Sequence, residues 1–265
     1  MKFFNNLIIF FLNFKIINSY QSNKYSYIIK QKLKSKYSDH SILGYKKSRD
    51  ILFNDLKKTL VYGNNISENI NCEHIWCQKY FNYKEPMKSD LHIMFLANSK
   101  LNSHRQDYKF SNIYSNFIFL NNKGNKIENN FINNIISFKL YKKNNSKKLF
   151  EPNNKSKGKI SRSIAYYDLI YNNHNKNINN IIVKKDLIEW NRKHLPRIED
   201  IERNEMIRTY QKNINPFIKY PFFIELLYND EFCFFNFYKL SFYSIFTIII
   251  SDLFKIKFFL KKNIS

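Results

Sequence analysis

The sequence of 265 residues contains very little alanine, glycine or cysteine. Two Ala and four Gly stand among abundant Asn, Lys, Ile, Phe and Tyr, a usage that A/T-rich coding DNA would impose. The three cysteines, Cys72, Cys77 and Cys233, allow at most one disulfide bond, which excludes a disulfide-stapled scaffold. They leave the redox compartment of the protein undecided.

Acidic residues are also scarce. The chain has 21 Asp and Glu against 44 Lys and Arg, a formal net charge of +23 and a pI near 9.7. Residues 20–230 keep +18 of this charge, since the two ends contribute only +2 and +3. A basic domain favours a polyanionic partner such as nucleic acid. Because codon supply explains part of the lysine content, the charge serves here as supporting evidence.

Long hydrophobic runs are absent. Lys2 precedes an apolar run over 7–14, with a small-residue cleavage point after Ser19, which predicts a signal peptide over 1–19 and a secreted or secretory-pathway protein. The Phe-rich tail, 231–265, has its longest apolar run over 240–251, shorter than the roughly 20 residues of a membrane span. We therefore expect a buried element or an appendage there, without membrane contact, and one domain over 20–230.

Within 20–230, helical patterns alternate with polar stretches. Apolar residues at helical spacing predict a helix over 160–171, and two more are expected over 186–194 and 197–211. Pro216 and Pro221 are expected to break regular structure after the last of these. Asn- and Lys-rich stretches predict loops over 121–130, 142–148, 153–159 and 172–180.

The most informative block runs from Cys72 to Phe110. The stretch 90–97 has the pattern of a short strand, and 98–106 that of a helix with Asn98 as its N-cap. Asn102 and Arg105 are then three apart on one helix face. With Glu73 and His74 on an earlier strand, the block predicts a strand–strand–helix (ββα) unit around one cation.

These residue types suit phosphodiester hydrolysis. His74 has an ordinary pKa near neutrality and suits a general base that deprotonates water. Glu73 and Asn102 supply hard oxygen ligands for a Mg²⁺-type ion, for which Mn²⁺ or Ca²⁺ could substitute. Arg105 suits a phosphate contact, and Asn98 is a second substrate-binding candidate. For these two the alternatives are a solvated helix residue and a simple cap.

A zinc site is an alternative for the same block. Cys72, His74 and Cys77, with His92 or His104, could bind a structural Zn²⁺, although their spacing matches no standard zinc motif. The segment "EHIWC" is also not the H-E-x-x-H pattern of metalloprotease helices. For Asp90 and His92, two apart, we favour a satisfied core pair.

The quoted motifs resemble those of the bacterial endonuclease I and extracellular nuclease family, in the His-Me finger (ββα-metal) superfamily. The family pattern N-x-E-H-x-W-P-Q-S, S-D-L-H and P-x-D-G-K-x-N-S-x-R has as counterparts "NCEHIWCQK", "SDLH" and "LANSKLNSHR". The segments "LFEPNNKSKGKISRSIAYYDLIY" and "LIEWNRKH…ERNEMIRTYQKNINPFI" match later family motifs, so the resemblance covers about residues 33–225.

The resemblance implies an α+β fold with a ββα-metal nuclease core and surrounding helices. It implies a monomeric, Mg²⁺-dependent endonuclease that hydrolyses DNA, RNA or both with little sequence preference and leaves a 5′-phosphate. By position, His74 would be the general base, and Glu73 and Asn102 the metal ligands. Arg105 and Arg162 match family arginines, the second with a role that could be structural. No protein partner is indicated.

Several positions depart from the family pattern. Non-family residues stand at Cys77 and Leu96 (each Pro in the family), Asn98 and Ser99 (Asp-Gly), Lys212 (Gly) and Ile214 (Arg). None of these changes removes the expected base or ligands, but together they could loosen the loops around the site. An alternative function is therefore a nucleic-acid-binding protein that keeps the nuclease fold with little or no cleavage. A zinc-stapled structural domain is a third hypothesis.

Overall fold

The computed structural model describes residues 26–56, 60–63, 69–115, 117–127, 138–143, 147–171 and 177–229. The chain divides into two compact units, and residues 29–229 form the larger one. The predicted signal peptide, 1–19, and the tail, 231–265, lie outside the described residues. No helix within the described ranges is both long and apolar enough to cross a membrane.

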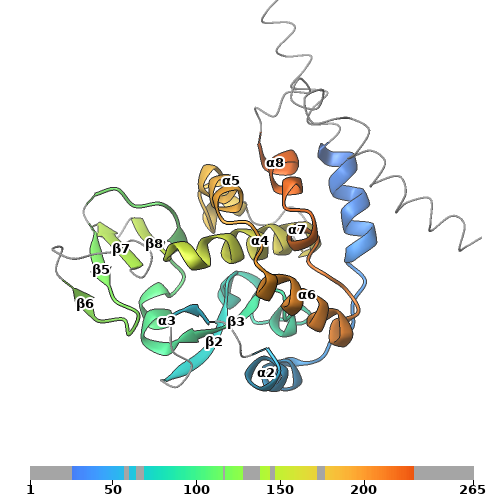
Figure 1. Ribbon diagram of the computed structural model, residues 1–265, viewed down its shortest axis with the longest axis horizontal. Coiled ribbons are helices and arrows are strands. Elements are labelled where there is room, and N and C mark those ends of the chain that lie inside the picture. Colours follow the sequence, from blue (N-terminus) through green and yellow to red (C-terminus); the bar gives the residue numbers. More distant parts are fainter. Residues whose placement is uncertain are drawn as a thin grey trace, which may run out of the picture. The chain divides into compact units, whose positions relative to one another are not determined.

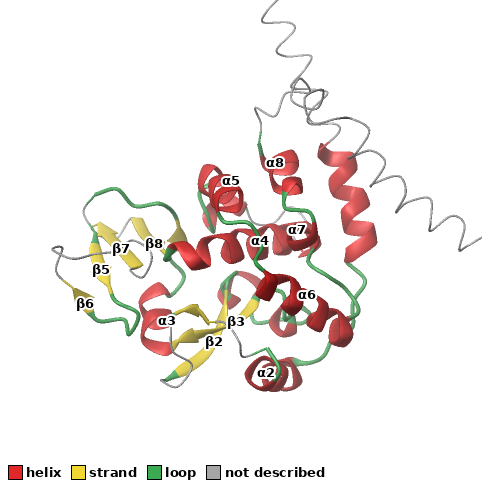
Figure 2. Ribbon diagram, viewed as in Figure 1, coloured by secondary structure: helices red, strands yellow, loops and turns green. Residues whose placement is uncertain are grey.

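Helices and short strands are mixed in the first part of the larger unit, the strands β4 to β8 then follow one another, and the rest is helical (Figures 1 and 2). A helix over 26–37 precedes elements with the following bounds: α2 Tyr45–Asn54, β1 Leu60–Tyr62, β2 Ile70–His74, η1 Gln78–Phe81, η2 Met87–Ser89, β3 Met94–Asn98, α3 Ser99–Arg105, β4 Lys109–Phe110, β5 Ile118–Leu120, β6 Lys126–Ile127, β7 Phe138–Lys143, β8 Lys147–Glu151, α4 Asn154–Tyr171, η4 Ile178–Asn180, α5 Lys184–Lys193, α6 Ile198–Gln211, α7 Pro216–Lys219 and α8 Phe222–Tyr228. The elements η1, η2 and η4 are short 3₁₀-helices. The α+β class expected from the sequence is confirmed.

A three-stranded sheet in the order β1-β3-β2 lies at the centre. The central strand, β3, pairs in parallel with β1 and antiparallel with β2, with Glu73 opposite Phe95 and His74 opposite Met94. All five residues of β3 are buried. One hydrophobic cluster joins this sheet to α2 and α6 and contains Ile51, Leu52, Leu56, Leu91, Met94, Leu96 and Ile207.

A second sheet has the strand order β4-β8-β7-β5-β6. The turn between β5 and β6 reaches α3, where the Gly124 carbonyl lies 3.1 Å from His104 Nε2 and Lys100 Nζ donates to Asn125 at 2.6 Å. Gly124 has φ +74°, and a Cβ placed on it would lie 2.9 Å from Lys100 Cγ. Glycine is therefore required at this turn, because it tolerates both the positive φ and the close approach.

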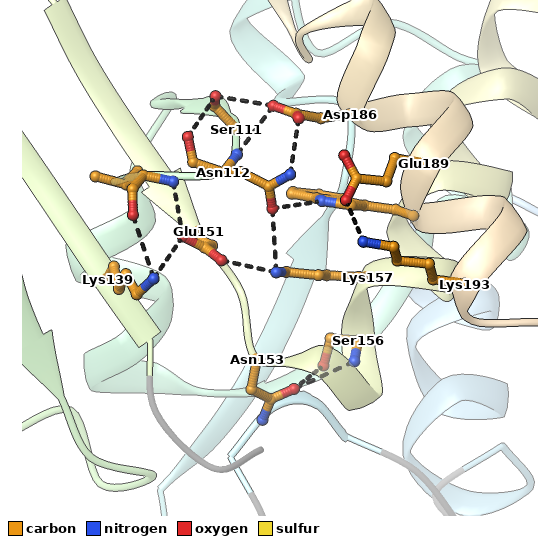
Figure 3. Close-up of polar contacts among 12 residues, drawn as sticks. Ser111, Asn112, Lys139, Glu151, Asn153, Ser156, Lys157, Asp186, Glu189 and Lys193 are labelled. Carbon is orange, nitrogen blue, oxygen red and sulfur yellow. Dashed lines mark hydrogen bonds and ion pairs between the residues drawn. The ribbon is translucent and has the colours of Figure 1, made fainter. Parts of the chain in front are cut away.

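Buried polar side chains join the second sheet to α4 and α5 (Figure 3). Glu151 accepts from Lys157 Nζ at 2.7 Å and from the Ile113 amide at 2.7 Å. Asp186 accepts from the Asn112 side chain at 2.8 Å, and Asn112 Oδ1 accepts from Lys157 Nζ at 3.1 Å. Each buried charge in this cluster thus has a partner, as burial in a low-dielectric interior requires.

The longest helix, α4, begins earlier than the sequence predicts. Residues 153–159, expected as a loop, supply its first turns, because Asn153 accepts from the Ser156 amide at 3.2 Å as a cap. Lys157 finds its buried partner in Glu151. The polar residues at the start of α4 therefore include buried ones, such as Ser156 and Lys157. The expected loop over 142–148 also contains the ends of β7 and β8.

The predicted positions of the later helices are confirmed, but hydrophobicity alone does not indicate which of their side chains are buried. Ile198 and Ile201 of α6 are exposed by 74% and 50%, whereas the buried face carries Asp200, Asn204 and Gln211. Regular structure breaks before each of the two prolines, and a short helix then begins: Pro216 is the first residue of α7, and Pro221 is the N-cap of α8. Proline suits a first helical turn because its missing N–H would be unpaired there.

Candidate active site

The predicted ββα unit is formed by β2, β3 and α3, which follow one another along the chain (Figure 1). The side chain of Asn98, the last residue of β3, accepts from the amides of Lys100 and Leu101 at 3.1 Å each. These bonds satisfy two amides that no helical carbonyl can reach, so the helix starts directly after the strand. Asn98 is thus the N-cap that the sequence predicts, and its carbonyl oxygen is engaged in that role.

Glu73 is a buried carboxylate on β2. Its Oε1 lies 3.1 Å from Arg105 Nη1 and accepts from the Tyr62 hydroxyl at 3.2 Å. Burial raises the pKa of Glu73 to about 7, although Arg105 and Tyr62 lower it. A buried carboxylate with so high a pKa would gain from a further positive charge beside it.

Asn102 lies on the same side of β2 as Glu73. Its Nδ2 donates to Asn71 Oδ1 at 2.9 Å and to the Cys72 carbonyl at 3.4 Å. Asn71 and Glu73 are two residues apart on the strand and therefore share a face. Both bonds use the amide nitrogen, so the Asn102 carbonyl oxygen is the atom suited to a cation.

His74 ends β2, and its two ring nitrogens differ. Nε2 lies 3.0 Å from the Lys88 carbonyl, so this nitrogen carries the proton and donates it. Nδ1 is buried and has no hydrogen-bond partner. Burial lowers the pKa of His74 to about 4, while the bond to Lys88 raises it. The ring is therefore neutral at pH 7, with a free lone pair on Nδ1.

Arg105 is placed differently from a solvated phosphate contact. The side chain is 2% exposed, and Nη2 donates to the Ile75 carbonyl at 2.6 Å. Nη1 donates to the Gln106 carbonyl at 2.9 Å as well as to Glu73. The guanidinium also lies over the Phe110 ring, 4.7 Å from its centroid. In this arrangement Arg105 is the buried counter-charge of Glu73.

Asp90 and His92 belong to the core, as expected, but not to a strand. They lie in the turn before β3, and the Asp90 carboxylate accepts from Tyr166, Tyr171 and Gln211. Burial would raise the pKa of Asp90, but the neighbouring His92 ring and hydrogen bonds from Tyr171 and Gln211 hold it below its usual value. His92 packs on Tyr166 with ring centroids 4.7 Å apart.

The side chains of the zinc alternative are not brought together. His92 Nε2 lies 3.4 Å from the Asn213 carbonyl, whereas His104 Nε2 bonds to Gly124 in the second sheet. Burial raises the pKa of Cys72 to about 12, which disfavours the thiolate that zinc needs. Within the described ranges, no three His, Cys, Asp or Glu side chains are placed to hold a metal ion.

Arg162 and Cys77, which the sequence analysis set against the family pattern, have roles in holding the fold. Arg162 is 2% exposed, donates to the His194 carbonyl at 2.8 Å and pairs with Asp200 at 3.1 Å, which ties α4 to α6. Cys77, where the family pattern has Pro, has φ −56° and ψ 133°. Proline adopts the same φ, so the substitution needs no change in the backbone.

Sequence reasoning missed three groups around the site. Asn71 could have been found from strand alternation, since it is two residues before Glu73. Tyr62 comes from another strand, and the acceptor on Lys88 is a backbone carbonyl. Neither leaves a signal in the sequence.

The profile of the family described as Endonuclease I matches residues 11–222, which is most of the chain. The match begins inside the stretch 1–19 that the sequence analysis assigns to a signal peptide. A search of curated proteins found no match.

Proposed function

The chain belongs to the endonuclease I family and is a nuclease, and on this premise we propose that it is a metal-dependent endonuclease with His74 as general base. The substrates proposed are DNA, RNA or both, cleaved with little sequence preference. The observation that carries the proposal is the free Nδ1 of a neutral, buried His74 directly after the Glu73 carboxylate.

The donor set fits a hard divalent cation. Glu73 offers a carboxylate whose pKa is raised by burial and which a further positive charge would stabilise, and Asn102 offers a carbonyl oxygen. These two residues would hold the ion, for which we propose Mg²⁺, with Mn²⁺ or Ca²⁺ as substitutes. When bound, such an ion supplies positive charge that stabilises the phosphate and the departing oxygen in the transition state.

The residues of the chain account for the proton transfer. His74 donates Nε2–H to the Lys88 carbonyl, which leaves Nδ1 to take a proton from the attacking water. The same carbonyl stabilises the imidazolium that forms. Arg105 holds Glu73 in place, and the basic surface of the domain would hold the nucleic-acid backbone, with affinity falling as salt rises.

The test is a cleavage assay of the full-length chain on plasmid DNA and on RNA, with Mg²⁺ and with EDTA. We expect cleavage only with the metal, and a loss of about 10²–10⁴-fold in His74→Ala with nucleic-acid binding retained. His104→Ala is the matched control, because the side chain of this second histidine lies 3.1 Å from the Gly124 carbonyl in the β5–β6 turn. Equal activity in His74→Ala and the wild type would show that His74 is not the general base.

The burial of His74 favours a second candidate, a nucleic-acid-binding protein with little or no cleavage. The side chain is 3% exposed, so water reaches it only after some movement. Salt-sensitive binding without cleavage, under every divalent ion tested, would support this candidate and contradict the first.

A further inference from the structure

The peptide between Lys88 and Ser89 is held on both sides at the point where it meets His74. The Lys88 carbonyl accepts from His74 Nε2 at 3.0 Å. On the other side of the peptide, the Ser89 amide donates to Glu85 Oε2 at 3.0 Å. The Ser89 carbonyl accepts from the Ser48 hydroxyl of α2 at 2.6 Å, and this hydroxyl is fully buried. Glu85 thus bonds directly to the peptide that accepts from His74, whereas Ser48 holds the peptide that follows it, between Ser89 and Asp90.

The arrangement has an electrical consequence. A carboxylate that accepts from a peptide N–H polarises the peptide, which makes its carbonyl a stronger acceptor. The stronger acceptor favours the tautomer of His74 with the proton on Nε2. In Ser-His-Asp triads a carboxylate holds the histidine tautomer by direct contact. Here one peptide group stands between Glu85 and the ring.

We propose that Glu85 and Ser48 are positioning residues that hold His74 in the Nε2–H tautomer, Glu85 through the Lys88–Ser89 peptide and Ser48 by holding the peptide that follows it. The inference rests on the proposed role of His74 as the base, because only this tautomer leaves Nδ1 free for water. Neither side chain touches the reacting atoms. Glu85 lies outside the motifs of the site and is exposed, so its sequence position gives no hint of the role.

Other charged or titratable groups approach the ring from neighbouring elements. Arg105 of α3 donates to the His74 carbonyl at 3.4 Å, and the Tyr45 ring of α2 lies 6.1 Å from the imidazole. Among the residues that the structure describes, these groups include Arg105, Lys88, Asp90 and Tyr45, together with Glu73, the preceding residue of β2. The hydrogen bond from Nε2 goes to the Lys88 carbonyl. The tautomer is therefore set at this peptide.

The experiment uses the full-length chain and the variants Glu85→Ala, Glu85→Gln, Ser48→Ala and the double variant Glu85→Ala/Ser48→Ala. The tautomer of His74 is read by ¹⁵N NMR at a pH where the ring is neutral. Cleavage of plasmid DNA is measured in single turnovers with saturating Mg²⁺, and DNA affinity is measured separately. Glu205→Ala is the control, because Glu205 is an exposed carboxylate paired with Arg208 on the surface of α6.

We expect Glu85→Ala and Ser48→Ala to populate the Nδ1–H tautomer and the double variant to cleave about 10-fold more slowly, with DNA affinity unchanged. Glu85→Gln keeps an acceptor for the Ser89 amide and should restore most of the wild-type signal. Glu205→Ala should match the wild type.

An unchanged tautomer in Glu85→Ala and in the double variant overturns the inference, whatever the cleavage rate. Because Glu85 is exposed, we expect Glu85→Ala to fold, and its tautomer can be measured even if Ser48→Ala does not fold. The NMR signal needs no catalysis. A shifted tautomer therefore supports the positioning role of Glu85 and Ser48, even if His74→Ala shows that His74 is not the general base.

Discussion

Arg105 Nη1 lies 3.1 Å from Glu73 Oε1, and both side chains are almost completely buried. The pair joins the helix of the ββα unit to its first strand, between the expected metal ligand and the residue expected to contact phosphate. Removing one member of a buried pair leaves the other charged and without compensation. The two residues are thus better described as one structural unit than as two separate functional groups.

Replacing Arg105 should therefore act mainly on stability. We expect Arg105→Ala to lower the free energy of unfolding by about 3–5 kcal/mol, measured by urea denaturation. Arg208→Ala is the matched control, because its partner Glu205 is exposed and such surface pairs contribute about 0–1 kcal/mol. Similar losses in the two variants would contradict the assignment of Arg105 as a buried counter-charge.

Metal removal offers a test of the ligands that does not depend on activity. A ligand that binds only the folded state at 100 times its Kd adds about 2.7 kcal/mol of stability. We expect Mg²⁺ to raise the Tm of the wild type relative to EDTA, and to have no such effect on Glu73→Gln or Asn102→Ala. Asn125→Ala removes a surface amide bonded to Lys100 and should keep the full effect. An undiminished Mg²⁺ effect in Glu73→Gln would rule out Glu73 as a ligand.

Acid should destabilise the protein through His92. Burial lowers the pKa of His92 to about 4, from an ordinary value of 6.5. The neutral ring contributes its stability fully above pH 6.5, and this stability is lost as pH falls from 6.5 towards 4, because only the unfolded chain takes up the proton there. The loss is on the order of 3 kcal/mol. In His92→Gln, urea denaturation from pH 7 to pH 4 should show a shallower loss of stability than in the wild type.

Two carboxylates in Figure 3 make a matched pair for a stability experiment. Glu151 pairs with the buried Lys157 at 2.7 Å, whereas Glu189 pairs with Lys193 on the exposed face of α5. We expect Glu151→Ala to cost about 3–5 kcal/mol. Glu189→Ala should cost about 0–1 kcal/mol. Equal costs in chemical denaturation would mean that the Glu151 cluster does not hold the second sheet.

Lys212 should be replaceable with a gain. It follows α6 with φ +70°, a left-handed conformation that costs a side-chain-bearing residue roughly 1–2 kcal/mol and that favours glycine at helix ends. The family pattern has Gly at this position. Lys212→Gly should therefore raise the midpoint of urea denaturation by the equivalent of about 1 kcal/mol. Arg208→Gly, inside the same helix, should lower stability by about 1 kcal/mol.

The candidate site could be predicted because its parts are close along the chain. Glu73, His74 and Asn102 lie within one strand–strand–helix unit, although alternation along β2 places Glu73 and His74 on opposite faces of the strand. The N-cap at Asn98 is equally local. The partners of these residues are not, since Tyr62 comes from a separate strand and Ser48 from α2. The sequence therefore predicted the candidate site residues, but not the residues that hold them in place.

The helix α6 shows a second limit. Its position followed from the sequence, but its buried face did not, because Asp200 and Asn204 are covered by partners from other segments. Asp200 pairs with Arg162, and Asn204 Oδ1 accepts from the Asn215 amide at 2.8 Å. A polar residue can be buried once such partners exist, and a pattern based on hydrophobicity alone assigns it to the surface. The same reasoning explains why 153–159 was expected as a loop.

Gly124 lies in the turn through which the second sheet contacts α3. The β5–β6 turn that contains it presses on Lys100 and His104, which flank Asn102 on the helix. Cleavage of this turn by limited proteolysis should therefore also affect α3. It would free the helix that carries Asn102 while the β1-β3-β2 sheet stays folded, and metal affinity would fall before the protein unfolds.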